Sequence, residues 1–245
     1  MLDWESPLLE TLMTSRHSLA ILAALALGAC NPTGITTISS DAANVRLANF
    51  LADTPAVTLS VTGLPLHSNT PFGQPTIYKL VSTNDKELAL TRTSDAFLIG
   101  ADSVTLILGR HYTYYALGIA VAFKSRLAVD DTVFAPAGKV KVRFLHGVKA
   151  QSTRGIDLYV SLPGDSLNVL TPLVPALAYG SVSPYISVDT SLTRVRLTIA
   201  GQTATIFDST FAASVADSTV VTLVATDKVG GGAPVRLQVV VDKAP

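Results

Sequence analysis

The sequence predicts an all-β protein built from two tandem antiparallel β-sandwich domains. Short stretches of alternating apolar and polar residues recur after residue 43, and the second half of the chain repeats the pattern of the first. An alternation with a period of two places one set of side chains on a core face and the other towards solvent, as in half-buried antiparallel strands. Charged residues make up only 15% of the chain, which suits a sandwich rich in Val, Thr, Leu and Ala.

The N-terminal residues have the features of a secretory signal that is cleaved off. Arg16 precedes the apolar run "SLAILAALALGA" at residues 18–29, which is too short for a transmembrane helix. Residues 1–12 carry three acidic residues, the wrong charge for the start of a signal, so we expect Met13 to be the true start. Residues 1–29 are therefore predicted to be absent from the mature protein.

The only cysteine of the chain, Cys30, follows this run directly. The four residues Leu27, Gly28, Ala29 and Cys30 resemble the bacterial lipobox, which implies cleavage before Cys30, a diacylglycerol thioether on its sulfur and an acyl chain such as palmitate on its amino group. Stable membrane anchoring takes two or more acyl chains, which favours this interpretation over a buried, inert cysteine. Asn31 at the next position favours the outer membrane.

The mature chain of 245 − 29 = 216 residues would carry 18 − 1 = 17 basic and 18 − 3 = 15 acidic residues, a net charge of 17 − 15 = +2. A near-neutral chain without a run of Lys or Arg argues against nucleic acid as a partner. With Cys30 acylated, no thiol remains for a disulfide, a CxxC redox motif or a zinc site. Residues 30–43, the lipidated cysteine and a Thr- and Ser-rich stretch, read as a tether.

An internal repeat divides the rest of the chain into domains at 44–131 and 140–245, joined by a linker at 132–139 that contains Pro136 and Gly138. The offset between the copies is 97 for "NVRLANF" on "KVRFLHG" and 99 for "AVTLSV" on "GIDLYV". It is 107 from "FGQPTIY" on "YGSVSPY" through "YTYYALG" on "TVVTLVA", and 112 for "LAVDD" on "VVVDK". The offset changes where turn residues crowd, and turns tolerate insertions.

These shared blocks resemble the DUF4397 domain family, whose members have no characterised function. The resemblance rests on Val45-Arg46 and Val142-Arg143, on residues 156–160, on the aromatic-Gly-x4-Tyr elements that end at Tyr78 and Tyr185, and on residues 112–118 after Gly109. It implies two Ig-like β-sandwiches in an exported, often surface-attached bacterial protein, and it brings no catalytic residues. The first copy departs from the pattern with Thr58 in place of an Asp, and the second lacks the Tyr and Gly of its late strand.

Motifs of enzymes are missing from the sequence, so we expect no catalytic residues, no cofactor and no metal. "YGSVSP" lacks the second Gly of a GxSxG motif, and His67, His111 and His146 stand alone. Asp130-Asp131 could join Asp53 in a calcium site, because hard cations take clustered oxygen ligands. A solvated charge pair that protects a sheet edge is the favoured interpretation of the two aspartates.

Two features are candidates for ligand binding. Tyr112 and Tyr114 project from the same face of a strand and could form a platform for sugars or peptides, although packing in the core is the favoured alternative. The stretch at 161–178 is eight residues longer than its counterpart in the first copy and rich in Leu, Val and Pro. It either covers a sandwich edge, as we expect, or exposes an apolar partner site.

We therefore expect a lipid-anchored protein of the bacterial cell envelope with a structural or adhesive and non-enzymatic role. Asn31 assigns it to the outer membrane in this interpretation. Its partners would be the membrane, through the lipid on Cys30, and an envelope protein or polysaccharide. The alternative is a module that binds carbohydrate or another envelope polymer. β-Sandwich folds host many functions, so the choice between these two roles must come from the functional site.

Overall fold

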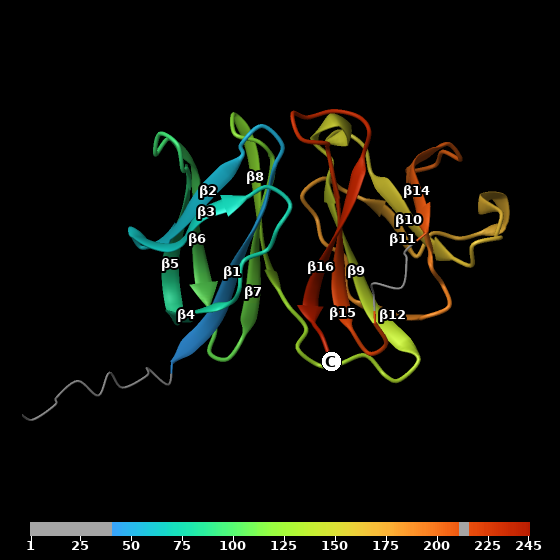
Figure 1. The fold of residues 1–245 in the computed structure, drawn as a ribbon, viewed down its shortest axis with the longest axis horizontal. Coiled ribbons are helices and arrows are strands. Elements are labelled where there is room, and N and C mark those ends of the chain that lie inside the picture. The colour runs from blue at the N-terminus through green and yellow to red at the C-terminus, as the bar shows by residue number, and fades with distance from the viewer. Residues whose placement is uncertain (1–40, 211–215) are drawn as a thin grey trace, which may run out of the picture. The chain divides into compact units, whose positions relative to one another are not determined.

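The computed structural model describes residues 41–210 and 216–245, and it is all-β, as predicted. A first β-sandwich contains β1 to β8 and a second contains β9 to β16 (Figure 1). The strands of the first are β1 (Ala42–Leu51), β2 (Ala56–Val61), β3 (Leu64–Pro71), β4 (Lys79–Ser82), β5 (Asn84–Arg92), β6 (Leu98–Leu106), β7 (His111–Ile119) and β8 (Ala122–Val129). Those of the second are β9 (Lys139–Gly147), β10 (Ile156–Ser161), β11 (Val174–Leu177), β12 (Ile186–Asp189), β13 (Arg194–Ile199), β14 (Thr205–Thr210), β15 (Val220–Thr226) and β16 (Arg236–Lys243), with short 3-10 helices at Lys149–Gln151 and Leu167–Val169.

Each sandwich has an outer and an inner four-stranded sheet. The outer sheets have the orders β3-β2-β5-β6 and β11-β10-β13-β14, and the inner sheets have the orders β4-β1-β7-β8 and β12-β9-β15-β16. The inner sheets of the two sandwiches face each other in the middle of Figure 1. Both sandwiches belong to one compact unit, residues 38–245.

The inner sheets differ from the half-buried pattern expected of antiparallel strands. β1 runs parallel to β7, and β9 runs parallel to β15, whereas the other pairs of the described strands are antiparallel. β7 is buried at seven consecutive positions and β15 along its whole length. Burial on both faces is typical of strands that lie between two layers, and it explains the continuous apolar runs of these strands.

Three apolar clusters follow from this layering. One fills the first sandwich and includes Leu47, Leu59 and Tyr114, and a second fills the second sandwich around Phe144 and Leu223. The third lies between the inner sheets and joins side chains of both sandwiches: Ala48, Phe50, Tyr115, Leu117, Ala128, Leu145, Val224 and Val240. Along β1 and β7, alternate residues thus serve the sandwich core and the contact with the other sandwich.

Strand pairing supports the internal repeat and corrects it at one strand. Leu59 pairs with Leu90 and Leu158 pairs with Leu197, which agrees with the offsets of 99 and 107. In the late strand, however, Thr113 lies opposite Arg46 and Thr222 lies opposite Arg143. The offset there is 222 − 113 = 109, not 107, so the sequence match of "YTYYALG" to "TVVTLVA" is wrong by two residues. A shift of two keeps every side chain on the same face, so the apolar pattern alone could not reveal it.

The long stretch at 161–178 covers a sandwich edge, as expected. Its β11 pairs with β10, and Val174 is buried against the second core together with the half-buried Leu173 and Leu177. The predicted signal and the lipobox residues Leu27, Gly28, Ala29 and Cys30 lie outside the described residues. Within the described part of the chain, no helix is long and apolar enough to cross a membrane.

Candidate functional site: a crossed arginine–aspartate cluster

A polar cluster lies between the inner sheets, beside the apolar contact of the two sandwiches. Each sandwich supplies an Arg, a Thr, an Asp and a Tyr from equivalent places: Arg46, Thr113, Asp130 and Tyr78 from the first, and Arg143, Thr222, Asp242 and Tyr185 from the second. The arginines come from β1 and β9, the threonines from the neighbouring parallel strands, and the aspartates from the position directly after β8 and from β16. The name crossed cluster is used below for these eight residues.

Each arginine reaches across to the aspartate of the other sandwich. Arg46 Nη2 donates to Asp242 Oδ1, and Arg143 Nη2 donates to Asp130 Oδ1. The same-sandwich distances are longer, with Arg46 Nη2 at 3.9 Å from Asp130 Oδ2, and Arg143 Nη2 at 3.9 Å from Asp242 Oδ1. The crossing is reinforced by the backbone, because Arg46 Nη1 donates to Val241 O at 2.8 Å. Arg143 Nη1 donates likewise to Val129 O at 2.7 Å.

The threonines and tyrosines complete the hydrogen bonding of the charges within each sandwich. Thr113 accepts from Arg46 Nε at 2.7 Å and donates to Asp130 at 2.6 Å, and Tyr78 donates to the same carboxylate at 2.7 Å. The second sandwich repeats these contacts through Thr222 and Tyr185. Arg46 lies over the ring of Tyr78 at 4.5 Å, and Arg143 lies over that of Tyr185 at 4.6 Å. Each carboxylate therefore accepts three hydrogen bonds, two from its own sandwich and one from the other.

Solvent scarcely reaches this cluster, since the arginine side chains are 3–5% exposed and the aspartate side chains 0%. Burial acts to lower the pKa of Arg46, but Tyr78, Asp242 and Asp130 outweigh it, so the pKa is raised above its ordinary value. The pKa of Arg143 is raised in the same way against its burial, by Tyr115 and Asp242. Both guanidiniums therefore stay charged, and they form ion pairs with the facing carboxylates rather than with an outside ligand.

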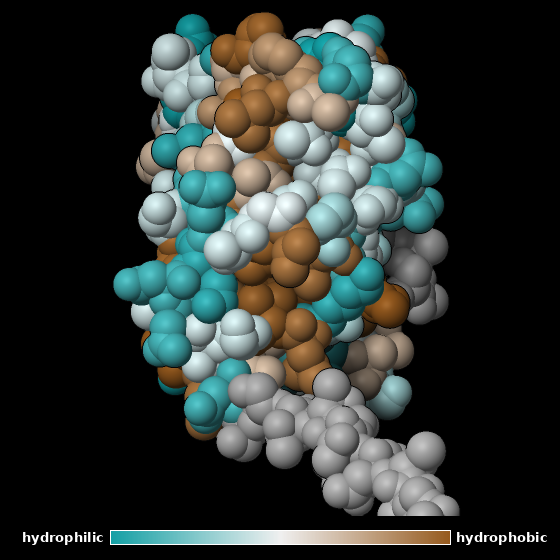
Figure 2. Space-filling model, turned by 90° about the vertical axis from the view of Figure 1, so that its left-hand side faces the viewer, coloured by the Kyte–Doolittle hydropathy of each residue, from teal (hydrophilic) through white to brown (hydrophobic). Residues whose placement is uncertain are grey.

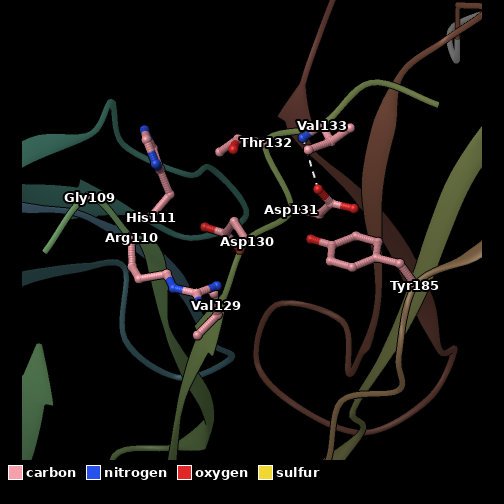
Figure 3. Close-up of a pocket in the computed structure, with 9 residues that line it drawn as sticks. All are labelled: Gly109, Arg110, His111, Val129, Asp130, Asp131, Thr132, Val133 and Tyr185. Atoms are coloured by element: carbon pink, nitrogen blue, oxygen red, sulfur yellow. Dashed lines mark hydrogen bonds between the residues drawn. The ribbon is translucent and has the colours of Figure 1, made fainter. Parts of the chain in front are cut away.

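An open groove of about 300 Å³ adjoins the cluster. It is lined by Arg110, His111 and Asp131 of the first sandwich, by the linker residues 132–133 and by Tyr185 of the second sandwich. Figure 3 shows Tyr185 facing Asp130 and Asp131 across this groove. The ring of His111 meets the ring of Tyr78 edge-on at 5.0 Å, so its contact is with the cluster. The groove therefore exposes the rim of the cluster, while the charges stay behind it.

Neither interpretation of Asp130-Asp131 from the sequence holds for Asp130. It is 5% exposed and accepts from Thr113, Tyr78 and Arg143, so it is neither a solvated edge charge nor a free calcium ligand. Asp131 accepts from Lys141 at 2.7 Å. Asp53, the third residue of the proposed calcium site, accepts from Ala120 N at the turn after β7, away from this pair. Among the described residues, no group of three His, Cys, Asp or Glu could hold a metal ion.

The proposed platform of Tyr112 and Tyr114 is not a surface. The two residues are 4% and 0% exposed and belong to the core of the first sandwich, the alternative that the sequence favoured. Tyr114 donates its hydroxyl hydrogen to Asp102, and Tyr112 OH accepts from Ile107 N at 3.2 Å. They face inwards because the even-numbered positions of β7 point to the first core. Tyr115, on the other face of β7, contacts the second sandwich through Arg143.

The two buried histidines have structural partners. His67 Nε2 lies 3.1 Å from Val45 O, and His146 Nε2 lies 3.2 Å from Arg154 O while its Nδ1 accepts from Val148 N. Burial lowers the pKa of both imidazoles. Both rings are therefore neutral parts of the fold at neutral pH.

The crossed cluster was not singled out from the sequence, although its residues stand in the repeat. The offsets of 97, 107 and 112 align Arg46 with Arg143, Tyr78 with Tyr185, and Asp130 with Asp242. An Arg and an Asp that recur in both copies of an apolar strand pattern are the signal that could have revealed the cluster. Only the missed offset of 109 hid the Thr113–Thr222 pair.

One protein-family model matches part of the chain. Residues 43–159 match the DUF4397 family model, a domain of unknown function. The match covers the first sandwich, the linker and the start of the second sandwich, and it ends inside β10. It thus includes five residues of the crossed cluster: Arg46, Tyr78, Thr113, Asp130 and Arg143. A second copy of the family domain, expected at 140–245, stays a prediction. No curated protein matches the sequence.

Some solved structures resemble the chain weakly. One is described as "Alpha-glucan binding by a streptococcal virulence factor", with 13% identity, a TM-score of 0.24, and coverage of 74% of this chain and 92% of that one. Another is the family CBM26 module of Eubacterium rectale Amy13K in complex with maltoheptaose, with 11% identity, a TM-score of 0.25, and coverage of 83% and 98%. A third is the pneumococcal glycogen-degrading virulence factor SpuA, with 14% identity, a TM-score of 0.24, and coverage of 76% of this chain but 21% of that protein. At these TM-scores, the likeness carries no functional inference.

Proposed function

We propose that the protein is a non-enzymatic lipoprotein of the bacterial cell envelope, held in the outer membrane by lipid on Cys30. In this proposal, its two sandwiches form one stiff body that presents loops to an envelope partner. The observation that carries the proposal is the crossed cluster, because its two buried ion pairs join one sandwich to the other. Domains in one chain commonly move relative to one another unless the contact between them is large and apolar.

The loops at the end of the strands opposite Ala42 support the presentation role. Loops of both sandwiches meet there, since Gly230 N of the β15–β16 loop donates to Ala52 O at 2.7 Å. Lys149 N, at the short helix after β9, donates to Asp227 at 2.8 Å. A tethered body whose β1 begins beside the membrane would hold this end away from it. The loops of both sandwiches would then be offered as one surface.

The anchor is tested by replacing Cys30 with Ala in the native host and fractionating the cells. The variant should move from the membrane to the soluble fraction, because the acyl chains have no other attachment point. A Thr33→Ala variant in the same stretch is the matched control and should stay in the membrane. Retention of Cys30→Ala in the membrane would show that the lipobox interpretation is wrong.

The role of the body is tested with the purified protein and the envelope of its own host. The protein is incubated with peptidoglycan, with surface polysaccharide and with detergent-extracted envelope proteins, and bound material is recovered. Recovery of one envelope protein supports the adhesive or structural role. Retention on polysaccharide would favour the alternative of a carbohydrate- or envelope-polymer-binding module, which would need residues other than the buried Tyr112 and Tyr114.

A further inference from the structure

Several exposed apolar side chains lie together at one end of the first sandwich. Leu64 follows the β2–β3 turn and is 75% exposed, and Leu80 in β4 is 60% exposed. Ile107 and Leu108, in the loop between β6 and β7, are 57% and 55% exposed. These four residues are called the apolar rim below. Figure 2 shows apolar side chains reaching this end of the first sandwich.

The rim borders a groove of about 380 Å³ that is lined mainly by apolar residues. Leu64 and Leu80 lie on it together with Val61, Leu66 and Lys86. Close by, Lys79 Nζ donates to Leu66 O at 2.6 Å, which keeps a second ammonium beside the groove. Apolar side chains bordered by lysines suit a membrane interface, where the stems rest on apolar surface and the charges meet anionic headgroups.

The length of the chain limits how far this end can lie from Cys30, the proposed lipid attachment point. Gly109 N, directly after the rim loop, donates to Ala42 O at 2.9 Å, and Thr83 N, directly after β4, donates to Asp41 O at 3.1 Å. From Cys30 to Asp41 there are 41 − 30 = 11 residues. Eleven residues span at most about 36–40 Å even when fully extended. The rim is therefore confined near the bilayer surface whenever Cys30 is anchored.

We propose that the apolar rim rests in the interfacial layer of the lipid bilayer and so sets the orientation of the two sandwiches on the membrane. This inference rests on the anchor proposed above. Moving one exposed leucine side chain out of water strengthens membrane partitioning by roughly tenfold or more. An anchored chain already holds the rim at high local concentration, so a contact of this strength keeps it engaged. The loops at the opposite end then point away from the membrane.

The test uses the purified full protein with one of two matched fluorescent labels on the first sandwich. Ser82→Cys places a dye beside the rim, and Ser94→Cys places it in the β5–β6 turn at the opposite end of the same sandwich. The protein is reconstituted in vesicles of phosphatidylglycerol and phosphatidylcholine that contain nitroxide-labelled lipid. We expect the nitroxide to quench the dye at residue 82 but not the dye at residue 94.

Two double variants decide whether the rim causes the quenching. Leu64→Asn with Leu80→Asn should lower the quenching at residue 82 to the level of residue 94 while the protein still floats with the vesicles. Phe97→Asn with Leu98→Asn, an exposed apolar pair in and after the β5–β6 turn, should leave it unchanged. Because all four side chains are about half or more exposed, these variants should fold.

The outcomes separate the rim from the anchor. Vesicle flotation without quenching at residue 82, or equal quenching at both labels, overturns the inference and leaves the anchor intact. A dimer in light scattering that disappears in the Leu64→Asn, Leu80→Asn variant, without quenching, assigns the rim to a second copy and also overturns it. A dye count of two per chain would mean that Cys30 is a free thiol; the anchor then fails, and the inference that rests on it fails with it.

Discussion

Replacing Arg143 with Met is the sharpest test of the crossed cluster. The substitution leaves Asp130 without the guanidinium of the other sandwich and leaves Val129 O and Thr222 without a donor. The two side chains of the ion pair are 3% and 0% exposed, so solvent cannot replace the lost charge. Removing one partner of a buried ion pair costs about 3–5 kcal/mol, which for a chain of this length lowers the melting temperature by roughly 6–20 °C.

The assay is urea unfolding of the purified protein, followed by far-UV circular dichroism and by tyrosine fluorescence. Arg194→Met is the matched control, because Arg194 forms a two-point ion pair with Asp208 at the surface, where the side chains are 28% and 35% exposed. Solvent screens an exposed pair, so Arg194→Met should unfold at nearly the same urea concentration as the wild type. The wild type should unfold in one transition, and the Arg143→Met variant should show a separate transition for each sandwich.

A double-mutant cycle tests the crossing itself. Asp130→Asn combined with Arg143→Met should give a coupling energy of roughly 1–3 kcal/mol, since the two groups share a buried hydrogen bond. The same cycle between Asp130 and Arg46, which lie 3.9 Å apart in one sandwich, should give a smaller value. A cost below about 1 kcal/mol for Arg143→Met, or a larger coupling within a sandwich than across, would refute the assignment.

Three further predictions concern the rest of the fold. Tyr112→Ala combined with Tyr114→Ala should unfold the first sandwich, because each buried ring removed costs about 3–5 kcal/mol. The variants Tyr112→Phe and Tyr114→Phe keep the rings and should fold. A stable double-alanine variant in circular dichroism would contradict the core placement. The pKa of His67 and of His146 is lowered in the folded state, so both histidines contribute fully to the free energy of unfolding above their unfolded pKa near 6.5. This contribution declines as the pH falls below 6.5, because the unfolded state then binds more protons. Urea unfolding at pH 7.5 and 5.5 should show the loss, and a His146→Gln variant should show a smaller loss. Gly118→Ala should lower the melting temperature more than Gly63→Ala does. Both glycines have a positive φ, but only at Gly118 would a Cβ meet Tyr179 OH at 2.6 Å. Equal losses would mean that backbone strain alone matters.

The sequence by itself determined the fold class, the apolar faces of the strands and most of the repeat. Period-two alternation places Leu59 and Leu158 inwards without knowledge of the neighbours, because side chains alternate along any strand. The same reasoning placed Tyr112 and Tyr114 on one face. It could not tell whether that face met the core or solvent, since an aromatic ring suits both environments.

Only the tertiary structure decided what the second face of the inner strands does. Arg46 and Arg143 sit at positions where alternation predicts solvent, and Asp130 reads as a surface charge beside Asp131. The facing inner sheets bury these residues against one another. A contact between side chains 196 positions apart, such as Arg46 and Asp242, depends on how two complete sheets pack. Alternation along a strand is a local property, whereas the partner of a buried charge is a property of the packed fold.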